Sequence, residues 1–165
     1  LASVYFETAG EDEAGYAPAK KFFVAGGQYA RAFDAVSMGV VIEHANTISG
    51  SLSGDERPNI TYSHFIYQTG YTHEGRPIGS PFGGDTQTTS LGLWSRAING
   101  LHTNFWVDRV RQRETPQYKF NLDLELSVNC FTGRCSLALM RAPDFIADGI
   151  ESTKALSIGY QQRLW

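Results

Sequence analysis

The stretch Lys119–Val128, KFNLDLELSV, decides the fold class of this 165-residue chain. Apolar and polar residues alternate strictly along it, and the apolar positions are Phe120, Leu122, Leu124, Leu126 and Val128. A period of two places all the apolar side chains on one face of a β-strand, whereas an amphipathic helix needs a period near 3.6. The stretch therefore predicts a long strand with one apolar and one polar face.

The same alternation recurs along the whole chain, and no segment has the pattern of an amphipathic helix. We predict about nine strands, at residues 2–8, 20–31, 36–42, 62–71, 89–96, 101–113, 119–128, around 137–139 and at 155–165. Between them lie connections rich in Gly, Pro, Ser and Asp, and Asn99-Gly100 is the strongest signal for a hairpin with a two-residue turn. The prediction is an all-β, antiparallel protein. Because the composition does not break anywhere, we expect residues 1–165 to form a single segment with no second domain.

Composition excludes several classes of protein. The net charge of -3 argues against a nucleic-acid partner, because such proteins present a strongly basic surface. No apolar run approaches the roughly 20 residues that a membrane-spanning helix needs. The chain begins at Leu1, and residues 1–8 already have the pattern of the middle of a strand, so we expect the chain to be a fragment of a longer protein.

Two architectures produce this alternation. A soluble β-sandwich buries one face of each strand and exposes the other to water, and it is the more common of the two architectures. An up-and-down outer-membrane β-barrel turns the apolar face to lipid and the polar face to a lumen. Three features favour the barrel: several strands of about ten residues, second faces that mix Gly, Ser, Asn and charges of both signs, and the terminal aromatic residue Trp165.

The two cysteines, Cys130 and Cys135, flank a short Phe-Thr-Gly-Arg segment between two predicted strands. A hairpin there would bring them within disulfide distance, which suits an oxidising compartment. Two reduced thiols near a turn are an equal alternative. The spacing is not a zinc signature, and the sequence predicts no cofactor and no metal site.

An ordered set of short motifs resembles the capsule assembly protein Wzi family. It consists of Tyr67-x-x-Gly70-Tyr71-x-x-x-Gly75-Arg76-Pro77-Ile78-Gly79, then Gly84-Asp85 and Ser90-Leu91-Gly92, with further similarity upstream, so that residues 2–95 carry the resemblance. The resemblance implies a larger outer-membrane β-barrel of about eighteen strands, of which this chain is the C-terminal part. It also implies a bacterial surface lectin that tethers capsular or extracellular polysaccharide without catalysis. We expect such a protein to contact outer-membrane lipid and to be a monomer.

Within the family-like stretch, the candidate polysaccharide-binding residues are Tyr71, His73, Arg76 and Asp85. Sugars bind to aromatic faces and to planar polar groups, and an arginine fork reads the carboxylates of an acidic polymer. The competing interpretation is structural: Arg76 pairs with Glu74 or Asp85 and only holds the loop in shape.

Other side chains admit different roles. Trp94, Trp106, Arg109 and Arg111 can line a polar interior, although for the two tryptophans an aromatic girdle or apolar packing is the more common role. Asp123 and Glu125 share a strand face, as the acids of a glycosidase do.

The chain contains no G-x-S-x-G, H-E-x-x-H, Walker or dinucleotide-binding motif, so we predict no catalytic residues. The alternatives to the tethering role are a general outer-membrane porin and a soluble β-sandwich lectin.

Overall fold

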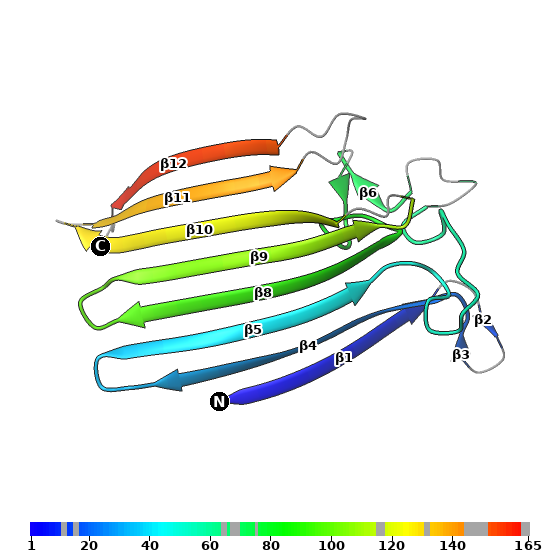
Figure 1. Cartoon of the computed structure of the whole chain (residues 1–165), viewed down its shortest axis with the longest axis horizontal. Helices are drawn as coiled ribbons and strands as arrows, with labels where there is room; N and C mark the ends of the chain where they lie inside the picture. Colours follow the sequence, from blue (N-terminus) through cyan, green and yellow to red (C-terminus); the bar gives the residue numbers. More distant parts are fainter. Residues whose placement is uncertain are drawn as a thin grey trace.

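Eight long antiparallel strands form one curved sheet in the computed structural model of this chain, shown in Figure 1. The structure describes residues 1–10, 13–14, 17–63, 66, 70–74, 76–114, 118–130, 133–143 and 152–162. The strands of the sheet are β1 (Ala2–Gly10), β4 (Lys21–Ala32), β5 (Val36–Asn46), β8 (Thr86–Ala97), β9 (His102–Gln112), β10 (Tyr118–Cys130), β11 (Gly133–Pro143) and β12 (Ser152–Gln162). Two small hairpins, β2 (Glu13–Ala14) with β3 (Ala17–Pro18) and β6 (Thr72–His73) with β7 (Arg76–Pro77), lie in the connections.

The sheet has up-and-down topology, because each long strand pairs with the next long strand along the chain. This confirms the predicted all-β antiparallel fold. Within the part of the chain that the structure describes, β1 and β12 are the two edges of the sheet. No helix of the described residues is long and apolar enough to cross a membrane.

The prediction of a strand at residues 62–71 is wrong at its described positions, which are turn, bend or coil. Tyr62 and Gly70 have positive φ angles of 65° and 60°, a backbone conformation that a strand does not contain. The segment instead closes on itself, since the Tyr71 amide donates to the Tyr62 carbonyl at 3.0 Å. The sheet therefore contains eight long strands where the sequence predicted about nine.

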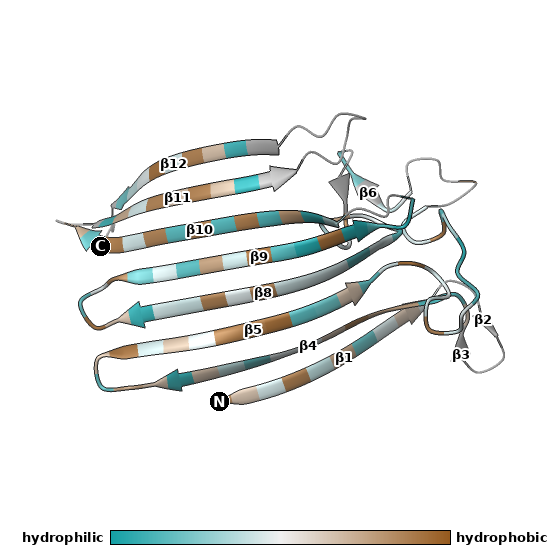
Figure 2. Cartoon of the chain, viewed as in Figure 1, coloured by the Kyte–Doolittle hydropathy of each residue, from teal (hydrophilic) through white to brown (hydrophobic). Residues whose placement is uncertain are grey.

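The apolar residues of successive strands line up across the sheet. Leu93 on β8 pairs with Phe105 on β9, and Phe105 pairs with Leu124 on β10. The row continues through Leu139 and Leu156 on β11 and β12. Because residues directly opposite each other point to the same side, this register gives the sheet one continuous apolar face. Figure 2 shows the alternation that produces it along β10.

The apolar face has polar and aromatic margins. Near the end of β4, the Arg31 guanidinium lies 5.1 Å from the centre of the Phe33 ring. At the opposite end of the strands, Arg109 lies 3.7 Å from the centre of the Tyr118 ring. Arg109 belongs to this face because it pairs with Phe120 on β10. The predicted place of Arg109 in a polar interior is therefore wrong, and the same holds for Arg111, two residues further along the strand.

The connections differ strongly between the two ends of the sheet (Figure 1). At one end, which we call the turn end, they are residues 33–35, 98–101 and 131–132. At the other, the loop end, they are residues 11–20, 47–85, 113–117 and 144–151. The predicted Asn99-Gly100 hairpin is present, and only Gly100 of the two has a positive φ, of 85°. The Gly100 amide donates to the Ala97 carbonyl at 3.0 Å, and the Ala97 amide donates to the Leu101 carbonyl at 2.8 Å. Residues 98–100 therefore form a three-residue loop with a glycine bulge in place of the expected two-residue turn.

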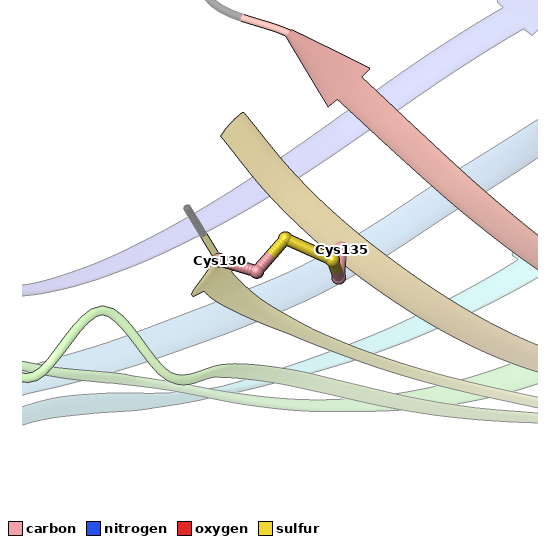
Figure 3. Close-up of a disulfide and its surroundings, with 2 residues drawn as sticks. All are labelled: Cys130 and Cys135. Carbon is pink, nitrogen blue, oxygen red and sulfur yellow. A yellow bond between two sulfur atoms is a disulfide. The ribbon is translucent and has the colours of Figure 1, made fainter. Parts of the chain in front are cut away.

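Cys130 and Cys135 form a disulfide at the turn end, with 5.9 Å between their Cα atoms (Figure 3). Cys130 ends β10 and pairs with Gly133, whereas Cys135 on β11 pairs with Val128. The two side chains are thus diagonal neighbours on one face of the β10–β11 hairpin.

Replacing both cysteines with Ser should lower the free energy of unfolding by about 2 kcal/mol, because the bridge closes only a short loop in the unfolded chain. The measurement is the guanidinium midpoint of the full-length protein in detergent, with and without dithiothreitol. The reductant should shift the midpoint of the parent and leave that of the Ser variant in place. A fully reduced parent with an unchanged midpoint would contradict the prediction.

Candidate functional site

The long connection 47–85 is anchored to the polar face of the sheet at the loop end. The Thr47 amide donates to the Thr86 carbonyl at 2.8 Å, and the Thr86 amide donates to Thr47 Oγ1 at 3.0 Å. Thr47 Oγ1 also lies 3.1 Å from the Gly83 carbonyl, and Ser49 Oγ donates to the Lys20 carbonyl at 3.1 Å. Thr47, Ser49 and Thr86 are buried, and their polar atoms find partners within the fold.

Tyr62 is the centre of the outer part of this connection. Its ring meets the edge of Phe22 on β4 at 6.1 Å between centroids, and it stacks on Tyr71 at 6.3 Å with 22° between the ring planes. The Tyr62 hydroxyl accepts from the Ser80 amide at 3.0 Å. Gly79 permits this arrangement, because a Cβ there would lie 2.3 Å from Tyr62 Cζ. The phenol of Tyr62 thus supports Tyr71 from one side, while 59% of Tyr71 remains exposed.

The predicted binding residues fall into two groups. His73 on β6 and Arg76 on β7 are register partners in the small hairpin directly after Tyr71, so the backbone brings these three positions together. His73 is exposed, whereas the side chain of Arg76 lies outside the described part of the structure. An ion pair of Arg76 with Glu74 or Asp85 stays untested for the same reason.

Asp85 lies elsewhere and holds the base of the connection. It has a φ of 55°, and its Oδ2 accepts from the Asn59 amide at 2.7 Å. The Asp85 carbonyl accepts from the Arg113 amide at 2.9 Å. Its Oδ1 is buried and has no hydrogen-bond partner among the described residues. These contacts make Asp85 a residue that positions the loop, at a distance in sequence from the Tyr71 hairpin.

Three aromatic side chains on the polar face lie over glycines of the neighbouring strand. Tyr5 is opposite Gly26, Trp94 is opposite Gly39, and Trp106 is opposite Gly92. A Cβ at any of the three glycines would come within 2.5 Å of the ring opposite. The two tryptophans therefore point to the polar side, and the girdle or apolar packing favoured from the sequence is wrong for them. Gly26, Gly39 and Gly92 could have indicated this orientation from the sequence, because a glycine inside a strand often marks a site where another group approaches the backbone closely.

The described residues contain no group of three or more His, Cys, Asp or Glu side chains that could hold a metal ion.

Comparisons with known proteins give two matches. A sequence profile for the family described as "Capsule assembly protein Wzi" matches residues 1–132. A similar solved structure is that of Wzi from Escherichia coli, described as an outer membrane protein involved in group 1 capsule assembly and as a carbohydrate-binding β-barrel. The two chains are 19% identical and superpose with a TM-score of 0.71, over 98% of this chain and 36% of that chain. No curated protein sequence matches. This chain therefore has the fold of a section of that barrel and spans about a third of its length.

Proposed function

The chain belongs to the capsule assembly protein Wzi family, and we propose that it is a section of a bacterial outer-membrane β-barrel that binds and tethers capsular or extracellular polysaccharide at the cell surface. The observation that carries the proposal is the match of the family profile along residues 1–132. The protein acts as a surface lectin, without catalysis and as a monomer. Residues 1–165 form one barrel segment within it.

The apolar face of the sheet contacts lipid. Large apolar side chains on this face are exposed from one edge of the sheet to the other, from Val4 at 88% on β1 to Ile158 at 82% on β12, and those of β9 are half-buried. A water-soluble monomer rarely exposes an apolar patch beyond a few hundred Å². In a bilayer the same face contacts lipid chains, so its apolar side chains are not exposed to water. The Arg31–Phe33 and Arg109–Tyr118 pairs at its margins lie at the depth of the lipid headgroups.

The loop end is extracellular. Outer-membrane barrels have short periplasmic turns and longer extracellular loops, and the connections of this sheet divide in the same way. Residues 47–85 then face the outside of the cell. The Cys130–Cys135 disulfide at the turn end lies on the periplasmic side, which is oxidising.

The exposed hairpin around Tyr71 binds sugar. The ring of Tyr71 offers an apolar face, and His73 offers a planar hydrogen-bonding group beside it. Arg76 adds a fork for the carboxylates of an acidic polymer. Asp85 contributes by holding the loop through Asn59.

Replacing Tyr71 with Ala should weaken polysaccharide binding between about threefold and tenfold, since a stacked aromatic ring contributes roughly 0.5–1.5 kcal/mol beyond its buried area. The measurement is binding of the full-length protein in detergent to polysaccharide extracted from its own cells. Arg76→Ala should make the remaining affinity less sensitive to salt if the polymer is acidic.

Ile78→Ala is the matched control. Ile78 lies in the same connection, is exposed, and donates its backbone amide to the Tyr71 carbonyl at 3.0 Å, a bond that alanine keeps. Binding should be unchanged in this variant. If Tyr71→Ala and Arg76→Ala also leave binding unchanged, the hairpin is structural and polysaccharide binds elsewhere.

A further inference from the structure

A cavity of about 150 Å³ opens on the polar face where β8, β9 and β10 run side by side. Its polar-face lining consists of Gly92, Trp94, Asn104, Trp106, Asp123 and Glu125. Since one water takes up roughly 30 Å³ in the liquid, this cavity accommodates about five waters or a ring-sized solute in their place. We call it the indole cleft.

The two indoles of the cleft are held flat against the wall. Trp106 lies over Gly92, where a Cβ would be 2.0 Å from Cζ3 of its ring, and Trp94 lies over Gly39, where a Cβ would be 2.5 Å from its Cε2. One side of each ring is therefore covered by backbone. The remaining surface is open, since Trp106 is 38% exposed. Glycine at both positions is what allows two large rings to present their free surfaces to the cleft.

Hydrogen bonds fix the orientation of the polar groups. Trp106 Nε1 donates to Asp108 Oδ1 at 2.7 Å, and Asp108 is buried, so the indole cannot turn without breaking a charge-assisted bond. Asn104 Nδ2 donates to Glu125 Oε2 at 3.2 Å. This bond leaves the second oxygen of Glu125 and the carbonyl of Asn104 as acceptors within the cleft.

Asp123 is directly opposite Trp106 and belongs to the same lining. Its carboxylate has no hydrogen bond or ion pair with any described residue. The described lining thus contains two carboxylates and no cation. Ionised carboxylates are acceptors only, so the cleft demands a ligand that brings hydroxyl donors.

We propose that the indole cleft binds neutral pyranose units of the polysaccharide, an inference that rests on the proposed tethering function. The apolar faces of the sugar rings stack on Trp94 and Trp106, and the sugar hydroxyls donate to Asp123 and Glu125. Sugar units that carry a carboxylate do not bind in the cleft, because Asp123 and Glu125 repel a third negative charge. The extracellular hairpin, with Arg76, is then the part of the protein that meets acidic units.

The test uses two oligosaccharides of equal length and linkage, maltohexaose and hexagalacturonate, titrated calorimetrically in detergent. The parent for this test is the full-length protein carrying Tyr71→Ala and Arg76→Ala, so that the extracellular hairpin binds neither oligosaccharide. Maltohexaose should bind and hexagalacturonate should not. Trp106→Leu should weaken maltohexaose binding between about threefold and tenfold. Tyr29→Leu, an exposed aromatic on the opposite face of the same sheet, should leave it unchanged.

A variant that preserves side-chain volume guards against misfolding of the tryptophan variant. Asp123→Asn keeps the shape of the cleft and removes one negative charge. It should therefore reduce the difference in affinity between maltohexaose and hexagalacturonate. Absence of maltohexaose binding, equal binding by parent and Trp106→Leu, or equal binding of both oligosaccharides by the parent would each overturn the proposal. Polysaccharide extracted from the cells, titrated into full-length protein with an unaltered hairpin, separates the two claims. If this protein does not bind the polysaccharide, the tethering function is refuted. If it binds the polysaccharide and Trp106→Leu fails to weaken maltohexaose binding, the cleft alone is refuted.

Discussion

Replacing Leu139 with Arg is expected to destabilise the membrane-inserted protein by about 2–4 kcal/mol, the cost of an arginine on the lipid face near the middle of the bilayer. Leu139 is exposed on β11 and lies between Leu124 and Leu156 in the central apolar row. The guanidinium would have no water and no partner at that depth. The measurement is reversible unfolding of the full-length protein in liposomes by guanidinium.

Ala138→Arg is the matched control, one residue away on the other face of the same strand. Ala138 is directly opposite Glu125 on β10, so the new charge gains a cross-strand partner on the polar face of the sheet. Its effect should stay within about 1 kcal/mol. If the two variants lose equal stability, or Ala138→Arg loses more, the assignment of the two faces is wrong.

The second large effect is expected at Gly50. Gly50→Ala should destabilise the base of the 47–85 connection by roughly 2–4 kcal/mol, from a strained backbone and a steric collision. Gly50 has a φ of 77°, and a Cβ there would lie 1.9 Å from the Asp55 carbonyl oxygen. The residue cannot move outward freely, because its amide donates to the Lys21 carbonyl at 3.1 Å. Hydrogen exchange of the Gly50 amide and proteolysis of the connection on intact cells measure the change.

A variant at Gly54 separates the effect of the strained backbone from that of the steric collision. It has the same φ of 77°, yet nothing lies within 4 Å of the position that its Cβ would occupy. Gly54→Ala should therefore cost only the backbone strain, about 1 kcal/mol. Similar protease sensitivity in the two variants would show that the contact with Asp55 does not hold the turn.

Most of the sheet could be predicted because alternation is a local property. The stretch Lys119–Val128 forms most of β10, which has one further residue at its N-terminal end and two at its C-terminal end, and the weaker pattern at 20–31 corresponds to β4. The failure at 62–71 has a physical reason. Its Tyr and Phe residues favour a strand, but the hydrogen bond from Tyr71 to the Tyr62 carbonyl closes a loop that no local pattern reveals. The Tyr62 ring therefore packs against Phe22, and the Tyr62 backbone does not pair with a neighbouring strand of the sheet.

The candidate site was predictable only where its residues are close in sequence. Tyr71, His73 and Arg76 fall on one hairpin for that reason. The indole cleft depends on register between three strands, which sets Trp106 opposite Gly92 and Asp123. Asp85 was predicted as a binding residue, and the structure shows its carboxylate on the Asn59 amide. The family profile also extends to residue 132, beyond the 2–95 that the motifs carried.

The most direct test of the tethering function is the distribution of polysaccharide between cells and medium after deletion of the gene. Cells that lack the protein should still make the polymer but lose most of it to the medium, and the restored parent gene should return it to the surface. Deleted cells that hold as much polysaccharide as the parent would contradict the proposed function.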